Sequence, residues 1–332
     1  MRIRLCKAAL SAVLVVSVLL SMSFTVSAQE QSEHTAYTVD TLSKVYQICD
    51  RLAENMQARQ ILVYDTNTDR ILYTKTAGNG KLYPASITKL FSAYVALQYL
   101  TPDTEIIPGE ELDLVHEGSS LAFIPAGCQL YAETLVEGML LPSGNDAAII
   151  LAAAAGRVIA QEENLGAADA VAVFVDEMNL QAELLGFEMS HFSNPDGWHA
   201  GSHYTSLTDM ARISKLALEN ETIRQYMALA SDEATFISEH TAVWNNSNLL
   251  LNPELEYYRE DCIGMKTGYT RPSGHCLMSA FTFEEGEIVI GLFGYTDKYE
   301  RYVDAAMLAD AVRYQLLLEQ VDPENAKIES VG

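Results

Sequence analysis

Residues 84–90 read PASITKL, and this short stretch decides how the rest of the chain is interpreted. Pro84 disfavours helix just before it, and apolar residues at helical spacing follow as far as about Leu100. Ser86 is therefore expected at a helix N-terminus, with Lys89 one turn further along the same face. Free N–H groups there favour developing negative charge, and a lysine whose pKa is lowered can serve as the base for a serine. The stretch predicts a serine nucleophile.

Two further triplets lie in settings that suit the same chemistry. Ser143-Gly144-Asn145 falls between two expected helices, where its hydroxyl and amide can relay a proton and hold a substrate. Lys266-Thr267-Gly268 falls inside an apolar strand, where Lys266 can lower the pKa of Lys89 and attract a carboxylate. Each triplet alone is common, and a capping serine with an exposed lysine is the ordinary explanation of the first. All three in this order are uncommon.

Hydrophobic periodicity outlines the remaining elements. We expect a hairpin over 60–75 and late strands over 262–270, 275–283 and 286–295. Helices are expected over 39–52, 129–141, 145–160, 168–185, 206–218 and 299–319. Two early strands, a helical middle and three late strands predict an α/β domain of the α+β type, with a mainly antiparallel sheet flanked by helices.

The N-terminus has the pattern of an export signal. A basic start leads into an apolar stretch over 8–20, and Val26-Ser27-Ala28 ends it with small residues. The apolar stretch is short for a membrane span, which needs about 20 residues, although an uncleaved anchor stays open. Residues 1–28 are therefore expected to be a signal peptide, and the protein to act outside the cytoplasm, in an extracellular or periplasmic compartment.

Charge and cysteine content narrow the function classes. The chain has 45 acidic against 21 basic residues and a net charge of −24, which disfavours binding to nucleic acid or anionic lipid. Membrane contact is expected only through the signal segment, if it stays uncleaved. Four cysteines follow that segment, and we expect most of them to be buried free thiols: Cys49, Cys128, Cys262 and Cys276.

Three histidines close together raise the question of a metal site. His191, His199 and His203 share one turn-rich segment, but structural roles are favoured for them. Asp196 and Gly197, in the same segment, are expected to be turn residues rather than acid or base groups. No metal or organic cofactor is implied.

Four segments resemble the low-molecular-mass penicillin-binding proteins, the serine-type D-alanyl-D-alanine carboxypeptidases. They read PASITKL, LLPSGNDAAIILA, GMKTGYT and, over 191–213, HFSNPDGWHAGSHYTSLTDMARI. The resemblance covers roughly residues 56–315 and implies a β-lactamase/transpeptidase-like fold with a helical subdomain. It divides the chain into a leader with a helix over 29–55, a catalytic domain over 56–320 and a polar tail over 321–332.

The resemblance also implies catalytic roles. Ser86 would attack the carbonyl between the two terminal D-alanines of peptidoglycan stem peptides, and Lys89 would take its proton. Ser143 and Asn145 would pass protons to the leaving D-alanine and hold the substrate. Water would then hydrolyse the acyl-enzyme, whereas penicillins and other β-lactams would leave a stable adduct on Ser86.

Substrate binding is implied for the strand that carries the third triplet. Lys266 and Thr267 would bind the terminal carboxylate, and Gly268 would let the substrate backbone come close. The N–H groups of Ser86 and Tyr269 would form the oxyanion hole. Some relatives carry an arginine upstream that helps to bind the carboxylate, and Ser247 stands at the matching position here.

Several alternatives stay open at this point. Many relatives carry a second, β-rich domain and an amphipathic anchor, and both are expected to be absent here. A serine β-lactamase needs a glutamate that activates the deacylating water, and residues 177–180, EMNL, are a poor match for that element. A D,D-endopeptidase shares the same chemistry with a longer leaving group. A non-catalytic relative that binds the wall or senses β-lactams is disfavoured because all the catalytic positions are present.

Overall fold

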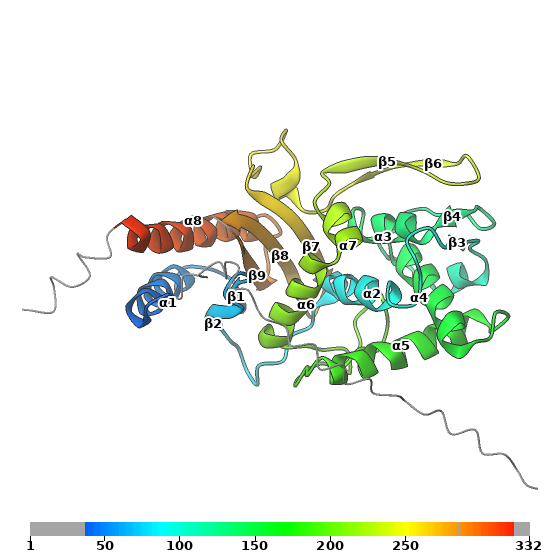
Figure 1. Cartoon of the computed structure of the whole chain (residues 1–332), viewed down its shortest axis with the longest axis horizontal. Coiled ribbons are helices and arrows are strands. Elements are labelled where there is room, and N and C mark those ends of the chain that lie inside the picture. The colour runs from blue at the N-terminus through cyan, green and yellow to red at the C-terminus, as the bar shows by residue number, and fades with distance from the viewer. Residues whose placement is uncertain (1–36, 284–285, 322–332) are drawn as a thin grey trace, which may run out of the picture. The chain divides into compact units, whose positions relative to one another are not determined.

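A five-stranded antiparallel sheet runs through the described part of the chain, residues 37–283 and 286–321 of the computed structural model (Figure 1). Its strand order is β2-β1-β9-β8-β7. The strands are β1 (Gln60–Asp65), β2 (Arg70–Lys75), β7 (Cys262–Thr270), β8 (Gly274–Phe283) and β9 (Gly286–Tyr295). Every neighbouring pair is antiparallel. The prediction of two early and three late strands in an antiparallel sheet is confirmed.

Alternating side chains of this sheet enter two separate hydrophobic cores. In β9, Ile288, Ile290 and Leu292 belong to one core, whereas Val289 and Phe293 belong to the other. The first core is completed by α1 (Val39–Ala53) and α8 (Glu300–Val321), which lie side by side (Figure 1). A sheet buried on both faces explains why its strands read as almost continuous apolar runs.

The second core is built by the helices between the early and late strands. They are α2 (Thr88–Ala96), α3 (Ala132–Leu140), α4 (Asn145–Ala160), α5 (Ala167–Leu184), α6 (Leu207–Glu219) and α7 (Glu221–Met227). Helix α4 runs through this core, and its apolar stretch from Ala147 to Ala153 is buried on all sides. Gly156 on α4 lies against the carbonyl of Ala170 on α5, where a Cβ would collide with that carbonyl.

Some short elements were not expected from periodicity. They are α7 and the hairpin of β5 (Ser231–Thr235) and β6 (Thr241–Asn245). A further short pair, β3 (Glu105–Ile106) and β4 (Leu130–Tyr131), lies before α3 in the chain. In the β5–β6 hairpin Ala234 and Trp244 are buried, while most of the other side chains are exposed. The sequence of the hairpin lacks the alternation that identifies a half-buried strand, because β5 has only one apolar residue and the exposed Val243 separates Ala242 from Trp244 in β6. Trp244 Nε1 donates to the carbonyl of Ala122 at 2.9 Å and holds the hairpin to the loop before α3.

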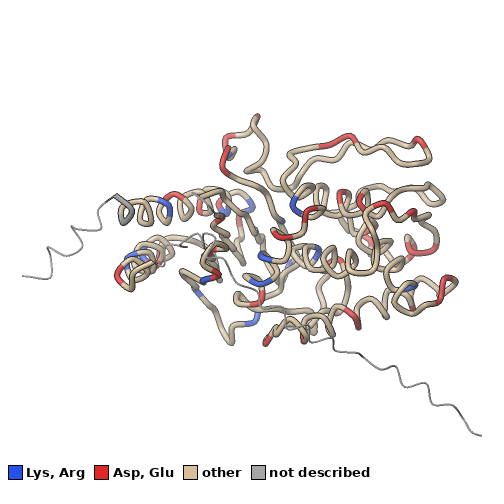
Figure 2. Tube along the Cα trace, viewed as in Figure 1, with Lys and Arg blue, Asp and Glu red and all other residues tan. Residues whose placement is uncertain are grey.

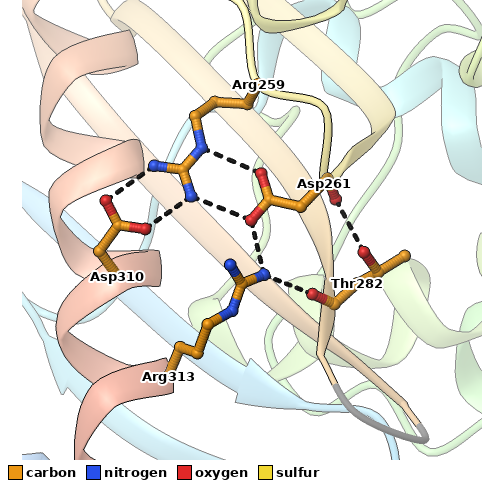
Figure 3. A network of polar contacts seen from close by, with 5 residues as sticks. All are labelled: Arg259, Asp261, Thr282, Asp310 and Arg313. Atoms are coloured by element: carbon orange, nitrogen blue, oxygen red, sulfur yellow. Dashed lines mark hydrogen bonds and ion pairs between the residues drawn. The ribbon is translucent and has the colours of Figure 1, made fainter.

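A charged network fastens α8 to the ends of β7 and β8 (Figure 3). Asp261 accepts from Arg259 at 2.9 Å and from Arg313 at 2.6 Å, and Arg259 also pairs with Asp310 at 2.6 Å. Arg313 further donates to the carbonyl of Thr282. Burial alone would raise the pKa of Asp261, but its hydrogen bonds and charge attraction with the two arginines hold that pKa below its ordinary value. Asp261 is therefore ionised at neutral pH.

The substitution Asp261→Asn is expected to lower the free energy of unfolding by about 1–3 kcal/mol, because two arginines lose their shared partner. Equilibrium urea unfolding measures this, with Asp176→Asn on the exposed side of α5 as the matched control. The contribution of Asp261 is complete above the pKa of an unfolded aspartate, about 3.9, and is lost as the pH falls through the lower folded-state value. A difference that is unchanged at pH 3 would contradict this account.

The cysteines agree with the sequence-based expectation. Cys49, Cys128, Cys262 and Cys276 are all free and buried, as predicted. Figure 2 shows Asp and Glu spread over the helices, strands and loops of the described part. The predicted signal peptide, the rest of the segment up to residue 36, and residues 322–332 of the predicted polar tail lie outside the described residues. None of the described helices has the length and apolarity that a membrane crossing requires.

Candidate active site

Ser86 lies in a single 3₁₀ turn, Ala85–Ile87, that leads into α2 at Thr88. The sequence predicted a helix start here, and the structure differs in that the α-helix begins two residues later. Ala85 has a φ of 50°, in the left-handed region. The turn packs closely against Gly197 and Gly268. A Cβ at Gly197 would collide with the carbonyl of Ala85, and a Cβ at Gly268 would lie 2.8 Å from the carbonyl oxygen of Pro84. Two glycines therefore fix where Ser86 sits.

Lys89 lies one turn beyond Ser86 and is fully buried. Its ammonium donates to Ser86 Oγ at 2.8 Å, to Asn145 Oδ1 at 2.7 Å and to the backbone carbonyl of Asp196 at 2.8 Å. Burial lowers the pKa of Lys89 to about 8, against the opposing effect of the Asp196 and Asp146 carboxylates. A pKa in that range lets a lysine accept a proton from a serine at a pH close to neutrality.

The second triplet lies between α3 and α4, facing Lys89. Ser143 has a φ of 67°, and Asn145 is the first residue of α4. Asn145 Nδ2 donates to Ser119 Oγ at 3.0 Å, so the side-chain oxygen is left to accept from Lys89. Asp146 accepts from the backbone N–H groups of two residues in the preceding loop, Ala122 and Ile124, and fixes the start of the helix.

The third triplet lies on β7. Lys266 is fully buried, and its ammonium donates to Thr267 O at 3.2 Å and to Ser247 Oγ at 3.4 Å. The hydroxyls of Ser247 and Thr267 are 2.6 Å apart. Burial lowers the pKa of Lys266 well below its ordinary value, and the positive charges of Lys89 and Arg301 lower it further. Met265, just before Lys266, has a φ of 98°.

These elements surround a pocket of about 620 Å³. Of the residues given catalytic, oxyanion-hole or substrate-binding roles by the resemblance, six line it: Ser86, Ser143, Asn145, Thr267, Gly268 and Tyr269. Lys89 and Lys266 have their side chains fully buried and do not line it. The structure thus brings the three triplets together around one pocket, as their order in the sequence led us to expect.

The comparisons with known proteins agree with this arrangement. Residues 47–292 match the peptidase S11 family, described as D-alanyl-D-alanine carboxypeptidase. The chain belongs to this family. It is 26% identical to the D-alanyl-D-alanine carboxypeptidase DacF of Bacillus subtilis over 260 residues, 76% of this chain and 61% of the relative. It is 28% identical to DacA of Escherichia coli over 253 residues, 72% of this chain and 56% of the relative. The chain therefore spans only about three fifths of the length of these two relatives.

A solved structure agrees on the fold. The crystal structure of a Streptomyces DD-transpeptidase has a TM-score of 0.67 and 27% identity, and the match covers 78% of this chain and 97% of that one. The predicted β-lactamase/transpeptidase-like fold of the carboxypeptidase family is thereby confirmed.

Sequence reasoning missed Arg301, which lines the same pocket from the start of α8. Its guanidinium is largely buried and donates to the carbonyl of Cys276 at 2.9 Å, to that of Gly268 at 3.5 Å and to the hydroxyl of Tyr302 at 2.9 Å. Nε has no hydrogen-bond partner among the described residues. Arg301 follows Gly268 by more than thirty residues, in a segment read only as a closing helix, so no local pattern marked it.

His203 joins the histidine segment to the start of α2, whereas His199 of the same segment lines the pocket. His203 is buried, its Nδ1 accepts from Ser193 N, and its Nε2 lies 2.8 Å from Thr88 Oγ1 at the start of α2. Burial lowers the pKa of His203 to about 3, so the ring stays neutral. Asp196 Oδ1 accepts from Trp198 N, as in a turn, but Asp196 and Gly197 both line the pocket, and the carbonyl of Asp196 also accepts from Lys89. Among the described residues, no group of three or more His, Cys, Asp or Glu side chains is placed to hold a metal ion.

Proposed function

We propose that the protein is a serine-type D-alanyl-D-alanine carboxypeptidase that removes the terminal D-alanine from peptidoglycan stem peptides. The observation that carries this proposal is the contact of 2.8 Å between Ser86 Oγ and Lys89 Nζ. Lys89 is fully buried and has a lowered pKa, which are the conditions under which a lysine activates a serine. Family membership supports the substrate class.

The reaction would proceed through two acyl transfers. Ser86 Oγ attacks the carbonyl carbon of the penultimate D-alanine while its proton moves to neutral Lys89. The N–H groups of Ser86 and Tyr269 stabilise the negative charge on the carbonyl oxygen. The peptide C–N bond then breaks, and the leaving nitrogen takes a proton through Ser143. Water then hydrolyses the ester, which releases the shortened peptide and regenerates free Ser86. Penicillins would stop at the ester stage.

The terminal carboxylate would be held at the β7 side of the pocket. The expectation from the sequence gave this role to Lys266 and Thr267. The buried position of Lys266, behind Thr267 O and Ser247 Oγ, favours an indirect electrostatic contribution from its side chain. Thr267 and Ser247 line the pocket, and Arg301 supplies a guanidinium there. Arg301 would help to bind the terminal carboxylate, which is the role of an arginine upstream of the third triplet in some relatives.

A substrate with an amidated terminal D-alanine is expected to lose about ten- to hundredfold in kcat/KM. A charge-assisted hydrogen bond contributes roughly 1.5–3 kcal/mol, and about 1.4 kcal/mol corresponds to a factor of ten. D-Alanine or D-alaninamide release from paired N-acyl tripeptides measures the loss. Arg301→Met should reduce hydrolysis of the acid strongly and that of the amide little. Equal hydrolysis of acid and amide by the unaltered protein would refute carboxylate recognition and favour an endopeptidase.

The β-lactamase alternative finds little support at the pocket. Glu177 accepts hydrogen bonds from Tyr99 and Gln181 and does not line the pocket. No activating carboxylate is therefore offered by the EMNL segment, and we expect labelled penicillin to stay bound for minutes. Release of the label within seconds would favour the β-lactamase.

We also propose that residues 1–28 direct export and that residues 56–320 form the catalytic domain. The basis for export is the apolar stretch over 8–20 and the small residues Val26-Ser27-Ala28 that follow it, as set out above. N-terminal sequencing of exported protein is expected to find Gln29 or a neighbouring residue as the first. Membrane-bound protein that retains Met1 would show an anchor instead.

A further inference from the structure

Arg271 is a charged group at the pocket for which the reaction just described has no use. It follows directly on β7 and lines the pocket together with Thr270 and Pro272. Its side chain is exposed, and no hydrogen bond or ion pair joins it to another described residue. In a chain with a net charge of −24, acidic residues outnumber basic ones, so an arginine at the pocket without an acidic partner is unusual.

The backbone beneath Arg271 is firmly held. Ser273 Oγ accepts from Thr270 N at 2.7 Å, and Ser273 N donates to Thr270 Oγ1 at 3.2 Å. Arg59 reaches across from the start of β1 and donates to the carbonyls of Pro272 and Ser273. The turn is therefore built in advance, while the guanidinium that it presents is free to bind.

Strand β7 sets the distance between Arg271 and the expected position of the substrate's terminal carboxylate at Thr267. At roughly 3.3 Å per residue, Arg271 lies about 13 Å along the chain from Thr267. A peptide with its terminal carboxylate near Thr267 and Arg301 has its reacting carbonyl beside Tyr269. Its preceding residues continue in the same direction, at about 3.3–3.6 Å each. The side chain of the third residue from its C-terminus then comes within reach of Arg271.

We propose that Arg271 selects substrates with a negatively charged group on the residue that precedes the D-alanyl-D-alanine dipeptide. The chemical class is a peptide with a side-chain carboxylate at that position, as opposed to an amide or an amine. This inference rests on the proposed carboxypeptidase function and adds a subsite to it. Arg301 would bind the terminal carboxylate, at the other end of the substrate. Its guanidinium is already hydrogen-bonded and largely buried, unlike that of Arg271.

Two nearly isosteric peptides test the proposal, N-acetyl-L-glutamyl-D-alanyl-D-alanine and its L-glutaminyl counterpart. At low ionic strength the unaltered protein should prefer the glutamyl peptide by about two- to fivefold in kcat/KM, the range of an exposed charge pair. Raising the salt to about 0.5 M should remove the preference. In Arg271→Gln the ratio should fall to about one. The ratio is taken within one enzyme, so a general loss of rate cancels.

Arg70→Gln on β2 is the matched control, because it removes an exposed arginine that does not line the pocket. Its ratio should equal that of the unaltered protein. A ratio near one in the unaltered protein, or a preference that survives Arg271→Gln, would overturn the Arg271 proposal and leave the proposed function standing. Release of D-alanine from neither peptide would overturn the proposed function, and the subsite with it.

Discussion

Replacing Ser86 with alanine is expected to abolish both penicillin labelling and D-alanine release, with a loss of at least about 10⁴-fold in kcat. Ser86 Oγ is the hydroxyl that Lys89 contacts, and the 3₁₀ turn holds it at the pocket between Gly197 and Gly268. Without this oxygen no acyl-enzyme can form, although the pocket can still bind the substrate. The loss should therefore fall on kcat rather than on KM.

Mass spectrometry of the penicillin adduct in the unaltered protein identifies the acylated peptide directly. Ser43→Ala, on an exposed turn of α1, provides the control for a serine without a catalytic position. Labelling that persists in Ser86→Ala, or an adduct that maps to another peptide, would remove the basis of the proposed mechanism.

The rate of acylation is expected to rise with pH through an apparent pKa near 8, because only neutral Lys89 can take the proton from Ser86. Burial is the main cause of the lowered pKa of Lys89. Lys266 is buried nearby, and the charge of Lys89 lowers the pKa of Lys266. Charge repulsion between two groups is mutual, so we expect the two lysines to titrate as a coupled pair.

Lys266→Met removes the second positive charge and should move the acid limb of the profile to higher pH. At pH 7 a smaller fraction of Lys89 is then neutral, and acylation slows. Labelling rates measured from pH 6 to 10 give the profile, and Lys215→Met on α6, which removes a surface charge paired with Asp69, is the control. An acid limb with the same apparent pKa in Lys266→Met as in the unaltered protein would show that the two lysines are not coupled.

The sequence predicted the elements whose signals are local. Periodicity located the five strands of the main sheet and the longer helices, and the three triplets located Ser86, Lys89 and Asn145. Arg301 and the carbonyl of Asp196 could not be found in this way. Both reach the site through contacts between distant segments, and a backbone carbonyl leaves no mark on residue type. The β5–β6 hairpin was missed because most of its side chains face solvent, so the alternation that marks a strand is absent.

The left-handed backbone at Ala85, Ser143 and Met265 has a consequence for how the protein tolerates change. Each of these non-glycine residues belongs to or adjoins one of the three triplets, and such conformations cost roughly 1–3 kcal/mol each. The rest of the fold has to compensate for this cost. Ala85→Gly would relieve part of it and would also loosen the turn that aims Ser86. Selection for heat resistance alone would therefore favour changes at these positions that slow the enzyme, so thermostability and turnover compete for the same few residues.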